Sequence, residues 1–383
     1  MKILSVVGAR PNFMKIAPFT QEIEKYNHNN VSDRLKNILV HTGQHYDGTM
    51  SQNFFRDLNI PKPDINLEIG SGTHAEQVGQ TMVAFEKVLQ NENPEWVVVV
   101  GDVNATLACS ITAKKENIKV CHIEAGLRSR DLTMPEEINR IVTDRLSDLL
   151  LTPDIMSSKN LIAEGVPDKN ITFVGNIMVD SLEANRDIAL ELKINSIIEQ
   201  NLFINKPILL PKKEYVLLTM HRPANVDNKN TLSSLIEVLI KSISKKIPLV
   251  WPMHPRTVKQ LKKLNLFNKL DNEKNIILLK PVSYHQMLKL NMGDKVMLTD
   301  SGGLQEECSV LGTPCLTLRE NTERPITLRE NGGTSVLVGN DVTSIIAEFN
   351  KILLGDMDSK VSRPKFWDGQ TAQRCLDAII NYN

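Results

Sequence analysis

Short apolar runs alternate with longer segments of helical apolar spacing along most of the 383 residues. In the first half these runs are MKILSVVG, NILVHTG, WVVVVGD, KVCHIEAG and ITFVGN, and we expect each to form a β-strand. Each run is nearly continuously apolar, which is typical of parallel strands covered by helices on both faces. Several runs end in Gly followed by polar residues, and ligands of open α/β sheets bind at the carboxyl ends of strands.

A second series of apolar runs follows a polar helical stretch and a Pro-bounded loop at 181–213. It consists of EYVLLTMHRP, IPLVWPMHP, NIILLKP, KVMLTDSGG, TPCLTL and TSVLVG. We therefore predict an α/β protein with two doubly wound, Rossmann-like domains that face one another across a cleft. The expected boundaries are 1–180 and 181–368, with a final amphipathic helix in 369–383 that could pack back on the first domain.

The overall charge of the chain excludes some classes of partner. The 45 basic and 45 acidic side chains balance, so the charge gives no support for nucleic acid or an anionic membrane as partner. No apolar run approaches the roughly 20 residues that span a bilayer, and the N-terminus resembles a first strand rather than a signal peptide.

The five cysteines form no CxxC pair, and we expect a cytoplasmic protein with reduced, buried thiols.

TDSGGLQEE, at 299–307, is the most informative segment of the second half. Asp300 or Ser301 can cap a helix, and Gly302 and Gly303 would let a phosphate or ribose approach the N–H groups of its first turn. Glu307, one turn further, could accept hydrogen bonds from a ribose diol. The alternative is a well-capped strand–turn–helix that binds nothing.

GARPNFMK, at 8–15, is another strand-end Gly turn, with Arg10 and Lys15 on either side of Pro11. Two cations near a helix start could hold a diphosphate. The alternative is a solvated turn. Because the segment is neither GxGxxG nor a Walker A loop, it gives no support for NAD or ATP as a ligand.

Polar side chains also follow other predicted strands of both halves. Asp102 ends WVVVV, Glu124 ends the KVCHI strand, and His221 and His254 end two strands of the second half. A single His is more often structural than functional, but their convergence at strand ends favours a site. Metal chemistry gains little support, because His122-x-Glu124 lacks a PCxxC partner and HExxH is absent.

Together these motifs resemble the non-hydrolysing UDP-N-acetylglucosamine 2-epimerases, whose fold is similar to that of GT-B glycosyltransferases. The resemblance runs through nearly the whole chain and rests on the combination of motifs rather than on any one. The motifs are GARPNFMKIAP, HTGQHYD, VVVVGDVNATLA, HIEAGLR, MPEEINR, VGN, HRP, TDSGGLQEE, RENTERP and DGQTA.

The resemblance implies that UDP is eliminated across C1–C2 of the sugar to give a 2-acetamidoglucal and is then re-added with the opposite configuration at C2. Asp102, Glu124 and Glu136 match the family's catalytic carboxylates, and His221 matches its histidine beside the diphosphate. We expect Asp102 and Glu136 to handle protons, and Glu124 to stabilise charge or orient the sugar. The substrate-binding candidates, from the residues and the resemblance together, are Arg10, Lys15, Arg140, His254, Ser301, Gly302, Gly303 and Glu307.

The resemblance further implies that no cofactor and no metal ion is needed, and that the protein is a homodimer. Two departures from the family pattern argue against activation by a second substrate molecule. The segment around TGQH reads Gln44-His45-Tyr46-Asp47, and GSGTHAE at 70–76 lacks an Arg-Gln pair. TERP is followed by Ile326, where many members have Glu.

Four alternatives remain open at this point. A hydrolysing 2-epimerase would release N-acetylmannosamine and UDP, and a further relative would act on another UDP-2-acetamido sugar. A GT-B glycosyltransferase would use the same nucleotide cleft but would not need several carboxylates in the first domain. A sugar-nucleotide sensor would bind without turnover, and the intact carboxylate set argues against it.

The predicted role of Glu136 can be tested directly. We expect Glu136→Gln to bind UDP as the wild type does and to lose turnover by orders of magnitude, because an amide can neither take up nor return a proton. Equilibrium binding of UDP and steady-state kinetics measure the two effects separately. Wild-type-like turnover would remove Glu136 from the mechanism.

Overall fold

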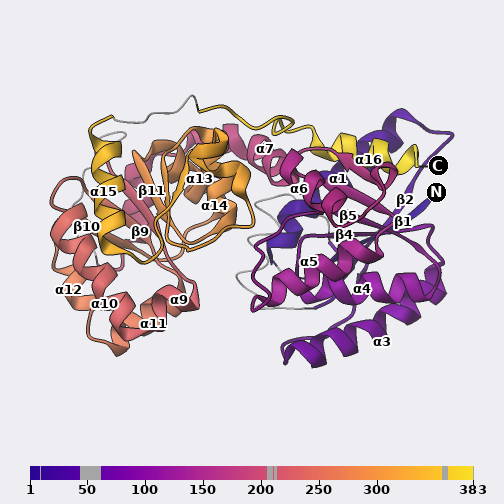
Figure 1. Cartoon of the computed structure of the whole chain (residues 1–383), viewed down its shortest axis with the longest axis horizontal. Helices are drawn as coiled ribbons and strands as arrows, with labels where there is room; N and C mark the ends of the chain where they lie inside the picture. Colours follow the sequence, from indigo (N-terminus) through magenta and orange to yellow (C-terminus); the bar gives the residue numbers. More distant parts are fainter. Residues whose placement is uncertain (9, 44–61, 205–209, 211–213, 356–360, 383) are drawn as a thin grey trace. The chain divides into compact units, whose positions relative to one another are not determined.

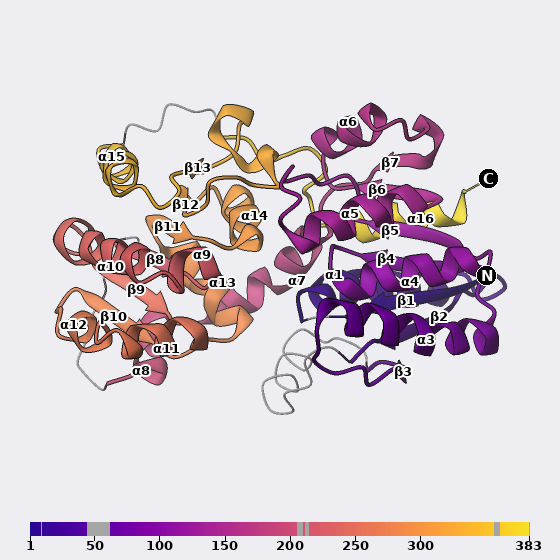
Figure 2. The same cartoon turned by 60° about the horizontal axis from the view of Figure 1, so that its bottom comes forward.

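The chain divides into two compact units, each built around its own parallel sheet (Figures 1 and 2). The computed structural model describes residues 1–8, 10–43, 62–204, 210, 214–355 and 361–382, and for residues 10 and 11 the backbone alone. The first unit comprises Met1–Ala184 and Lys365–Asn383, and the second comprises Asn185–Pro364. The first unit is therefore built from both ends of the chain.

The sheet of the first unit has the strand order β3-β2-β1-β4-β5-β6-β7, and all its described pairings are parallel. Its strands are β1 (Lys2–Val7), β2 (Lys36–His41), β3 (Ile65–Asn66), β4 (Trp96–Val100), β5 (Lys119–Ile123), β6 (Leu149–Thr152) and β7 (Ile171–Phe173). The order reverses direction between β1 and β4, and ligands of open α/β sheets bind beside the carboxyl ends of the strands at such a switch point.

Helices cover both faces of this sheet (Figure 2). The helices of this unit are α1 (Arg10–Asn29), α3 (His74–Glu92), α4 (Asn104–Lys115), α5 (Pro135–Leu146), α6 (Ile155–Ala163), α7 (Ile177–Glu191, which runs on into the second unit) and α16 (Thr371–Ile380). α3, α4 and α5 pack in a row, and α1 packs against α16. All five residues of β4 are buried, as expected for a central strand with helices on both sides.

The C-terminal segment is bound to the first unit at several points. The backbone N–H of Ala372, in the first turn of α16, donates to Asp180 of α7 at 2.7 Å. The indole of Trp367 donates to the carbonyl of Pro153 at 2.9 Å. Asp180 thus caps a helix whose sequence lies nearly 200 residues further along the chain.

The second unit repeats the same architecture with the strand order β10-β9-β8-β11-β12-β13, again parallel throughout. Its strands are β8 (Val216–Thr219), β9 (Leu249–Pro252), β10 (Ile276–Leu279), β11 (Val296–Thr299), β12 (Cys315–Thr317) and β13 (Ser335–Leu337). Its helices include α8 (Ile194–Asn201), α9 (Pro223–Val226), α10 (Lys229–Val238), α11 (Pro255–Lys263), α12 (Phe267–Asp271), α13 (Tyr284–Gly293), α14 (Gly302–Leu311) and α15 (Val342–Leu353). The switch point here lies between β8 and β11.

The predicted fold class, with two Rossmann-like domains, is confirmed by this topology. All six strands expected in the second half are present, and the five expected in the first half are β1, β2, β4, β5 and β7. β6 and the two-residue β3 were not predicted. All five cysteines are free and buried. No helix in the described part of the chain is long and apolar enough to cross a membrane.

Asp294, which follows α13, is buried, and its two carboxylate oxygens have no hydrogen-bond partner among the described residues. Burial, reinforced by the nearby Cys315 thiol, raises the pKa of Asp294 well above its usual value. The folded state therefore favours the protonated form. The stability that the fold gains from keeping Asp294 protonated is fully present below the pKa of Asp294 in the unfolded state. It is lost as the pH rises toward the pKa of Asp294 in the folded state.

We therefore expect Asp294→Asn to gain stability relative to the wild type as the pH rises from about 5 to about 8, by up to about 1.4 kcal/mol per pH unit. The amide stays neutral throughout this range, whereas the wild-type carboxyl is forced toward its charged form. Urea denaturation at several pH values measures the difference. A difference that does not change with pH would contradict the expected titration of Asp294.

Candidate functional site

Gly101, directly after β4, is the point where three segments of the first unit meet. Its φ is +70°, and a Cβ there would lie 3.1 Å from Lys15 Nζ, 3.2 Å from Glu124 Oε2 and 3.3 Å from Asn12 Nδ2. Asn12 also donates to the carbonyl of Val100 at 2.6 Å. The absent side chain therefore lets α1 and the end of β5 approach the end of β4 at the switch point of the sheet.

Glu124, the residue after β5, is buried with 5% of its surface exposed. Its carboxylate forms an ion pair with Lys15 of α1, which is buried as well. The φ of Glu124 is +74°, a backbone conformation that residues other than Gly rarely adopt and that is often found at functional sites. The ion pair therefore fixes the position of the Glu124 carboxylate at the strand end.

Arg140 of α5 connects Asp102 to the loop before α5. Its guanidinium forms an ion pair with Asp102 and donates to Glu137 Oε2 from Nη2 at 2.6 Å and from Nε at 3.0 Å. Glu137 also accepts from the backbone N–H groups of Ser129 at 2.9 Å and Arg130 at 2.8 Å. Burial opposes ionisation of Glu137, but these hydrogen bonds and the Arg140 charge hold its pKa below the usual value.

Glu136 lies beside Glu137 in the sequence but in a different environment. It is exposed in the first turn of α5, and among the described residues it makes no hydrogen bond or ion pair. Asn139 and Arg140 are three and four residues further on, so the helix places all three on one side. Asn139 donates to the carbonyl of Asp102 at 2.8 Å, which directs this side of α5 toward the end of β4.

The second unit presents a His–Asp pair at its own switch point. His221, two residues after β8, has its Nδ1 at 2.9 Å from an oxygen of Asp300, which follows β11. Asp300 is fully buried and also accepts from the backbone N–H groups of His221 and Arg222, both at 2.9 Å, and from Asn225 at 3.0 Å. Burial opposes its ionisation, but His221 and these donors hold the pKa of Asp300 below its usual value.

This pairing fixes the orientation of the His221 ring. With Nδ1 bound to Asp300, the other ring nitrogen is left for a ligand, and the side chain is 42% exposed. The exposed ring of His254, at the start of α11, lies 5.5 Å from that of His221 between centroids. Burial, with the charges of His221 and Arg256, lowers the pKa of His254.

The first turn of α14 lies beside this pair in the sequence and begins at Gly302. Ser301 occupies the N-cap position without a side-chain capping bond. A Cβ on Gly302 would lie 2.7 Å from Arg324 Nη1 and would displace that guanidinium, whereas Gly303 has open space around it. Unpaired N–H groups in a first helical turn favour an anion.

A network of charged side chains is connected to α14. Arg324 donates to Glu306 of α14 at 2.6 Å and pairs with Glu323, which also accepts from Arg319 at 2.6 Å. Glu307 is buried on the same helix, with Asn291 Nδ2 at 3.4 Å from its carboxylate. Burial raises the pKa of Glu307 to about 7, and the charge of Glu306 adds to this effect.

Some sequence predictions fall outside the described part of the chain. Arg10 begins α1, but its side chain is not described, and the segment 44–47 that bears on substrate activation is not described either. Among the described residues no group of three or more His, Cys, Asp or Glu side chains could hold a metal ion.

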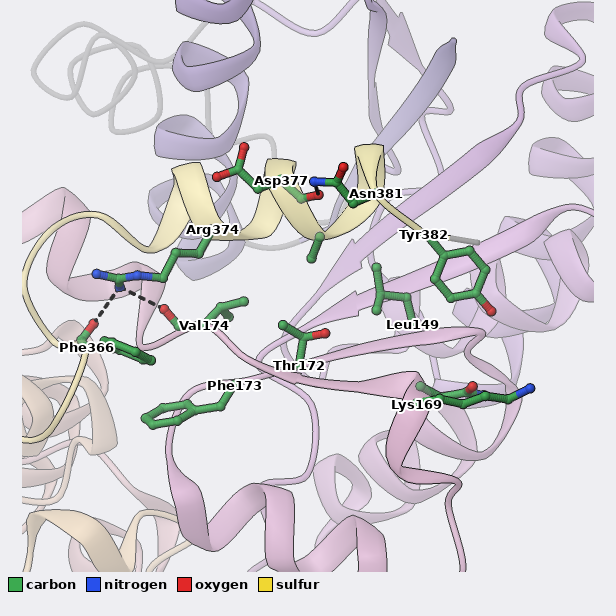
Figure 3. A pocket seen from close by; sticks show the side chains of 12 residues that line it. Leu149, Lys169, Thr172, Phe173, Val174, Phe366, Arg374, Asp377, Asn381 and Tyr382 are labelled. Carbon is green, nitrogen blue, oxygen red and sulfur yellow. Dashed lines mark hydrogen bonds between the residues drawn. The ribbon is translucent and has the colours of Figure 1, made fainter.

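One cavity of the first unit, about 650 Å³, lies apart from the predicted residues (Figure 3). It is bounded by β6, β7 and α16, and Arg374 crosses it to donate to the carbonyls of Val174 at 3.0 Å and Phe366 at 3.3 Å. None of the candidate site residues lines it.

Sequence reasoning missed the roles of Asp300 and Glu137. Asp300 had been considered as a helix cap, but its carboxylate holds His221 instead. The sequence signal for the role of Asp300 was that two predicted strands, which pair with one another, both end in polar residues. The signal for Glu137 was its position three residues before Arg140 on a predicted helix.

Comparisons with known proteins were made with the whole chain. The family model described as UDP-N-acetylglucosamine 2-epimerase matches residues 28–380. A UDP-N-acetylglucosamine 2-epimerase of Methanocaldococcus jannaschii is 42% identical over 387 residues, covering 100% of this chain and 99% of its own. A crystal structure of the UDP-GlcNAc 2-epimerase of that organism, in complex with UDP-GlcNAc and UDP, has a TM-score of 0.86 and 39% identity, with complete coverage of both chains.

A second relative acts on a different sugar. The UDP-2,3-diacetamido-2,3-dideoxy-D-glucuronate 2-epimerase of Pseudomonas aeruginosa is 39% identical over 326 residues, covering 84% of each chain. A lipopolysaccharide outer core galactosyltransferase, at 12% identity and a TM-score of 0.55, shares the fold alone. The predicted GT-B-like class is thereby confirmed.

Arg140 provides a test of the charge arrangement in the first unit. We expect Arg140→Met to lower the free energy of unfolding by about 3 kcal/mol, because Glu137 would be left buried without its cation. Urea denaturation measures the loss. The matched control is Arg256→Met. The ion pair of Arg256 with Asp227 is exposed, so the urea concentration at the midpoint of unfolding should hardly change. Equal effects of both substitutions would contradict the importance of the buried pair.

Proposed function

The chain belongs to the UDP-N-acetylglucosamine 2-epimerase family, and from this premise we propose that it interconverts UDP-N-acetylglucosamine and UDP-N-acetylmannosamine without net hydrolysis. The observation that carries the proposal is the group of carboxylates at the carboxyl edge of the first unit. Asp102 and Glu124 each have a cationic partner there, while Glu136 has none among the described residues.

The chemistry of C2 inversion explains why such a group is needed. The C2 proton of a 2-acetamido sugar has no neighbouring carbonyl, so its removal as a simple carbanion is unfavourable. If the C1–O bond to UDP breaks early, positive charge develops at C1 and the C2 proton becomes acidic. Carboxylates near the ring stabilise that charge and accept the proton, which gives UDP and a 2-acetamidoglucal. Re-addition of UDP with a proton delivered to the opposite face completes the inversion.

The pairings support a division of labour among the carboxylates. Glu124, buried against Lys15, suits a fixed negative group that stabilises the developing charge. Glu136 is exposed and without a cationic partner in the described part of the chain, which suits a group that exchanges its proton. Asp102 is held by Arg140 but remains partly exposed, which suits a base that takes up the C2 proton. We assign proton transfer to Asp102 and Glu136, one for each face of C2.

The second unit supplies groups suited to the nucleotide. In this proposal His221, oriented by Asp300, contacts the diphosphate and assists its departure, with His254 beside it. Ser301, Gly302 and Gly303 offer the N–H groups of the first turn of α14 to the same anion. Glu307 accepts hydrogen bonds from the ribose hydroxyls. Arg10 is a further candidate for the diphosphate from the resemblance, whereas Lys15 is engaged by Glu124.

An alternative substrate has specific support. The P. aeruginosa relative named for a 2,3-diacetamido-glucuronate is almost as similar to this chain as those named for UDP-N-acetylglucosamine. The same elimination and re-addition at C2 would serve that sugar, because the carboxylates act at C1 and C2. A hydrolysing outcome would follow if water reached the glucal or the C1 cation before UDP returned. The homodimer implied by the resemblance stays a prediction, for which sedimentation is the test.

Proton NMR of the purified protein with UDP-N-acetylglucosamine in D₂O, with no cofactor added, tests the proposal. We expect a new UDP-N-acetylmannosamine anomeric signal and entry of deuterium at C2, because C2–H is broken and remade with solvent. Free N-acetylmannosamine with UDP would instead favour the hydrolysing reaction. An unchanged spectrum would contradict the proposal and direct the same assay to the diacetamido-glucuronate substrate.

The raised pKa of Glu307 predicts a pH dependence of UDP binding. If the ionised carboxylate accepts the ribose hydroxyls, protonation below its pKa of about 7 weakens binding. UDP affinity should then fall about tenfold from pH 8 to pH 6, because one pH unit below the pKa leaves about a tenth of the group ionised. Glu307→Gln is the matched control, since it corrects for titration of UDP itself. Parallel pH profiles of the two proteins would exclude Glu307 as an ionised acceptor.

A further inference from the structure

His122 is a buried residue of the HIEAG motif that the proposed reaction does not use. It lies in β5, fully buried, between two acceptors. Its Nδ1 is 2.6 Å from Asp144 Oδ1, and its Nε2 is 2.9 Å from the carbonyl oxygen of Gly101. Its ring therefore joins the ends of two neighbouring strands and a helix.

Both ring nitrogens of His122 donate in this arrangement. A carbonyl oxygen can only accept, so Nε2 carries a hydrogen. Burial opposes ionisation of Asp144, but the charges of His122 and Arg128 hold the pKa of Asp144 below its usual value, so its carboxylate accepts from Nδ1.

Asp144 is itself fixed on its other oxygen. Arg128 Nη1 donates to it at 2.7 Å and the backbone N–H of Gly126 at 3.1 Å. Arg128 is in turn held by two hydrogen bonds to Glu164 of 2.8 and 2.7 Å. The ring of His122 therefore rests on an anion that cannot easily move, which makes it a rigid support rather than an isolated buried histidine.

The three segments joined by this ring are those that carry the proposed catalytic carboxylates. Gly101 directly precedes Asp102, and Glu124 lies two residues after His122, directly after the strand ends. Asp144 is on α5, the helix that carries Glu136 in its first turn and Arg140 one turn before Asp144. A shift of the ring would therefore change the separation of all three carboxylates.

We propose that His122 is a positioning residue of the C2 inversion, whose hydrogen bonds to Gly101 and Asp144 fix Asp102, Glu124 and Glu136 relative to one another. The inference rests on the proposed function. Two carboxylates that exchange protons on opposite faces of one carbon need closely defined positions, because misplacement of a reacting group by about 1 Å can cost 100-fold in rate.

Two substitutions separate the two hydrogen bonds of the ring. The amide nitrogen of Asn occupies the position of Nδ1, and that of Gln the position of Nε2. His122→Asn therefore keeps a donor for Asp144 but loses the link to Gly101, and His122→Gln keeps the link to Gly101. We expect kcat for UDP-N-acetylglucosamine epimerisation to fall about 100-fold in H122N and less than about 10-fold in H122Q. KM and the affinity for UDP should stay near wild type in both.

Cys121→Ala is the matched control. Cys121 is the preceding residue of β5, equally buried, with its side chain on the opposite face of the sheet. It tests the loss of a buried side chain from the same strand without touching Gly101 or Asp144. We expect its kcat to stay within about twofold of wild type, since none of the carboxylates is supported by that side chain.

The outcomes separate this inference from the proposed function. An inactive wild type in the same assay would overturn both. An active wild type together with an H122N variant of normal kcat, or an H122Q variant no better than H122N, would overturn the inference alone. Loss of UDP binding or of cooperative unfolding in both variants would also overturn it, because His122 would then support the fold as a whole.

Discussion

Three carboxylates around the carboxyl end of the first sheet, those of Glu124, Asp102 and Asp144, each meet a nitrogen-bearing side chain from another segment of the chain. Lys15 comes from α1, Arg140 from α5 and the His122 ring from β5 itself. Desolvation and mutual repulsion would otherwise neutralise these acids or drive them apart. The pairs therefore help to determine how α1, β5 and α5 are placed around the end of β4. The balance of charges and the geometry of the candidate site therefore depend on the same residue pairs in this unit.

Much of the fold could be predicted because parallel strands covered on both faces have a simple sequence pattern, a short and nearly continuous apolar run. The second half shows this well, since each of its six predicted strands is present. β6 escaped prediction because Leu149–Thr152 follows the end of α5 after only two residues, so that the apolar run merges with the helical pattern. β3 has two residues and too little pattern to be recognised.

The positions of the candidate residues at strand ends could be predicted, but their pairings could not. Polar residues at the ends of parallel strands gather at one edge whatever the details, and this placed Asp102 and His221 correctly at strand ends. Which partner each residue meets depends on strand register and helix rotation. The register Thr219↔Thr299 brings Asp300 to His221. In the dipeptide Glu136-Glu137, one helical step of about 100° separates an exposed side chain from a buried ligand of Arg140.

The return of the chain to the first unit has a consequence for its synthesis. A domain made from one continuous segment can fold as it leaves the ribosome, N-terminal part first. Here α16, with its cap on Asp180 and the Trp367 contact to Pro153, completes the first unit only after the whole second unit has been translated. The second unit is continuous and has its own core, so it is the part able to fold autonomously on the ribosome. Until α16 has been translated, the surface of α1 that it covers remains open to other nascent chains and to chaperones, and removal of α16 would harm the half of the protein that is made first.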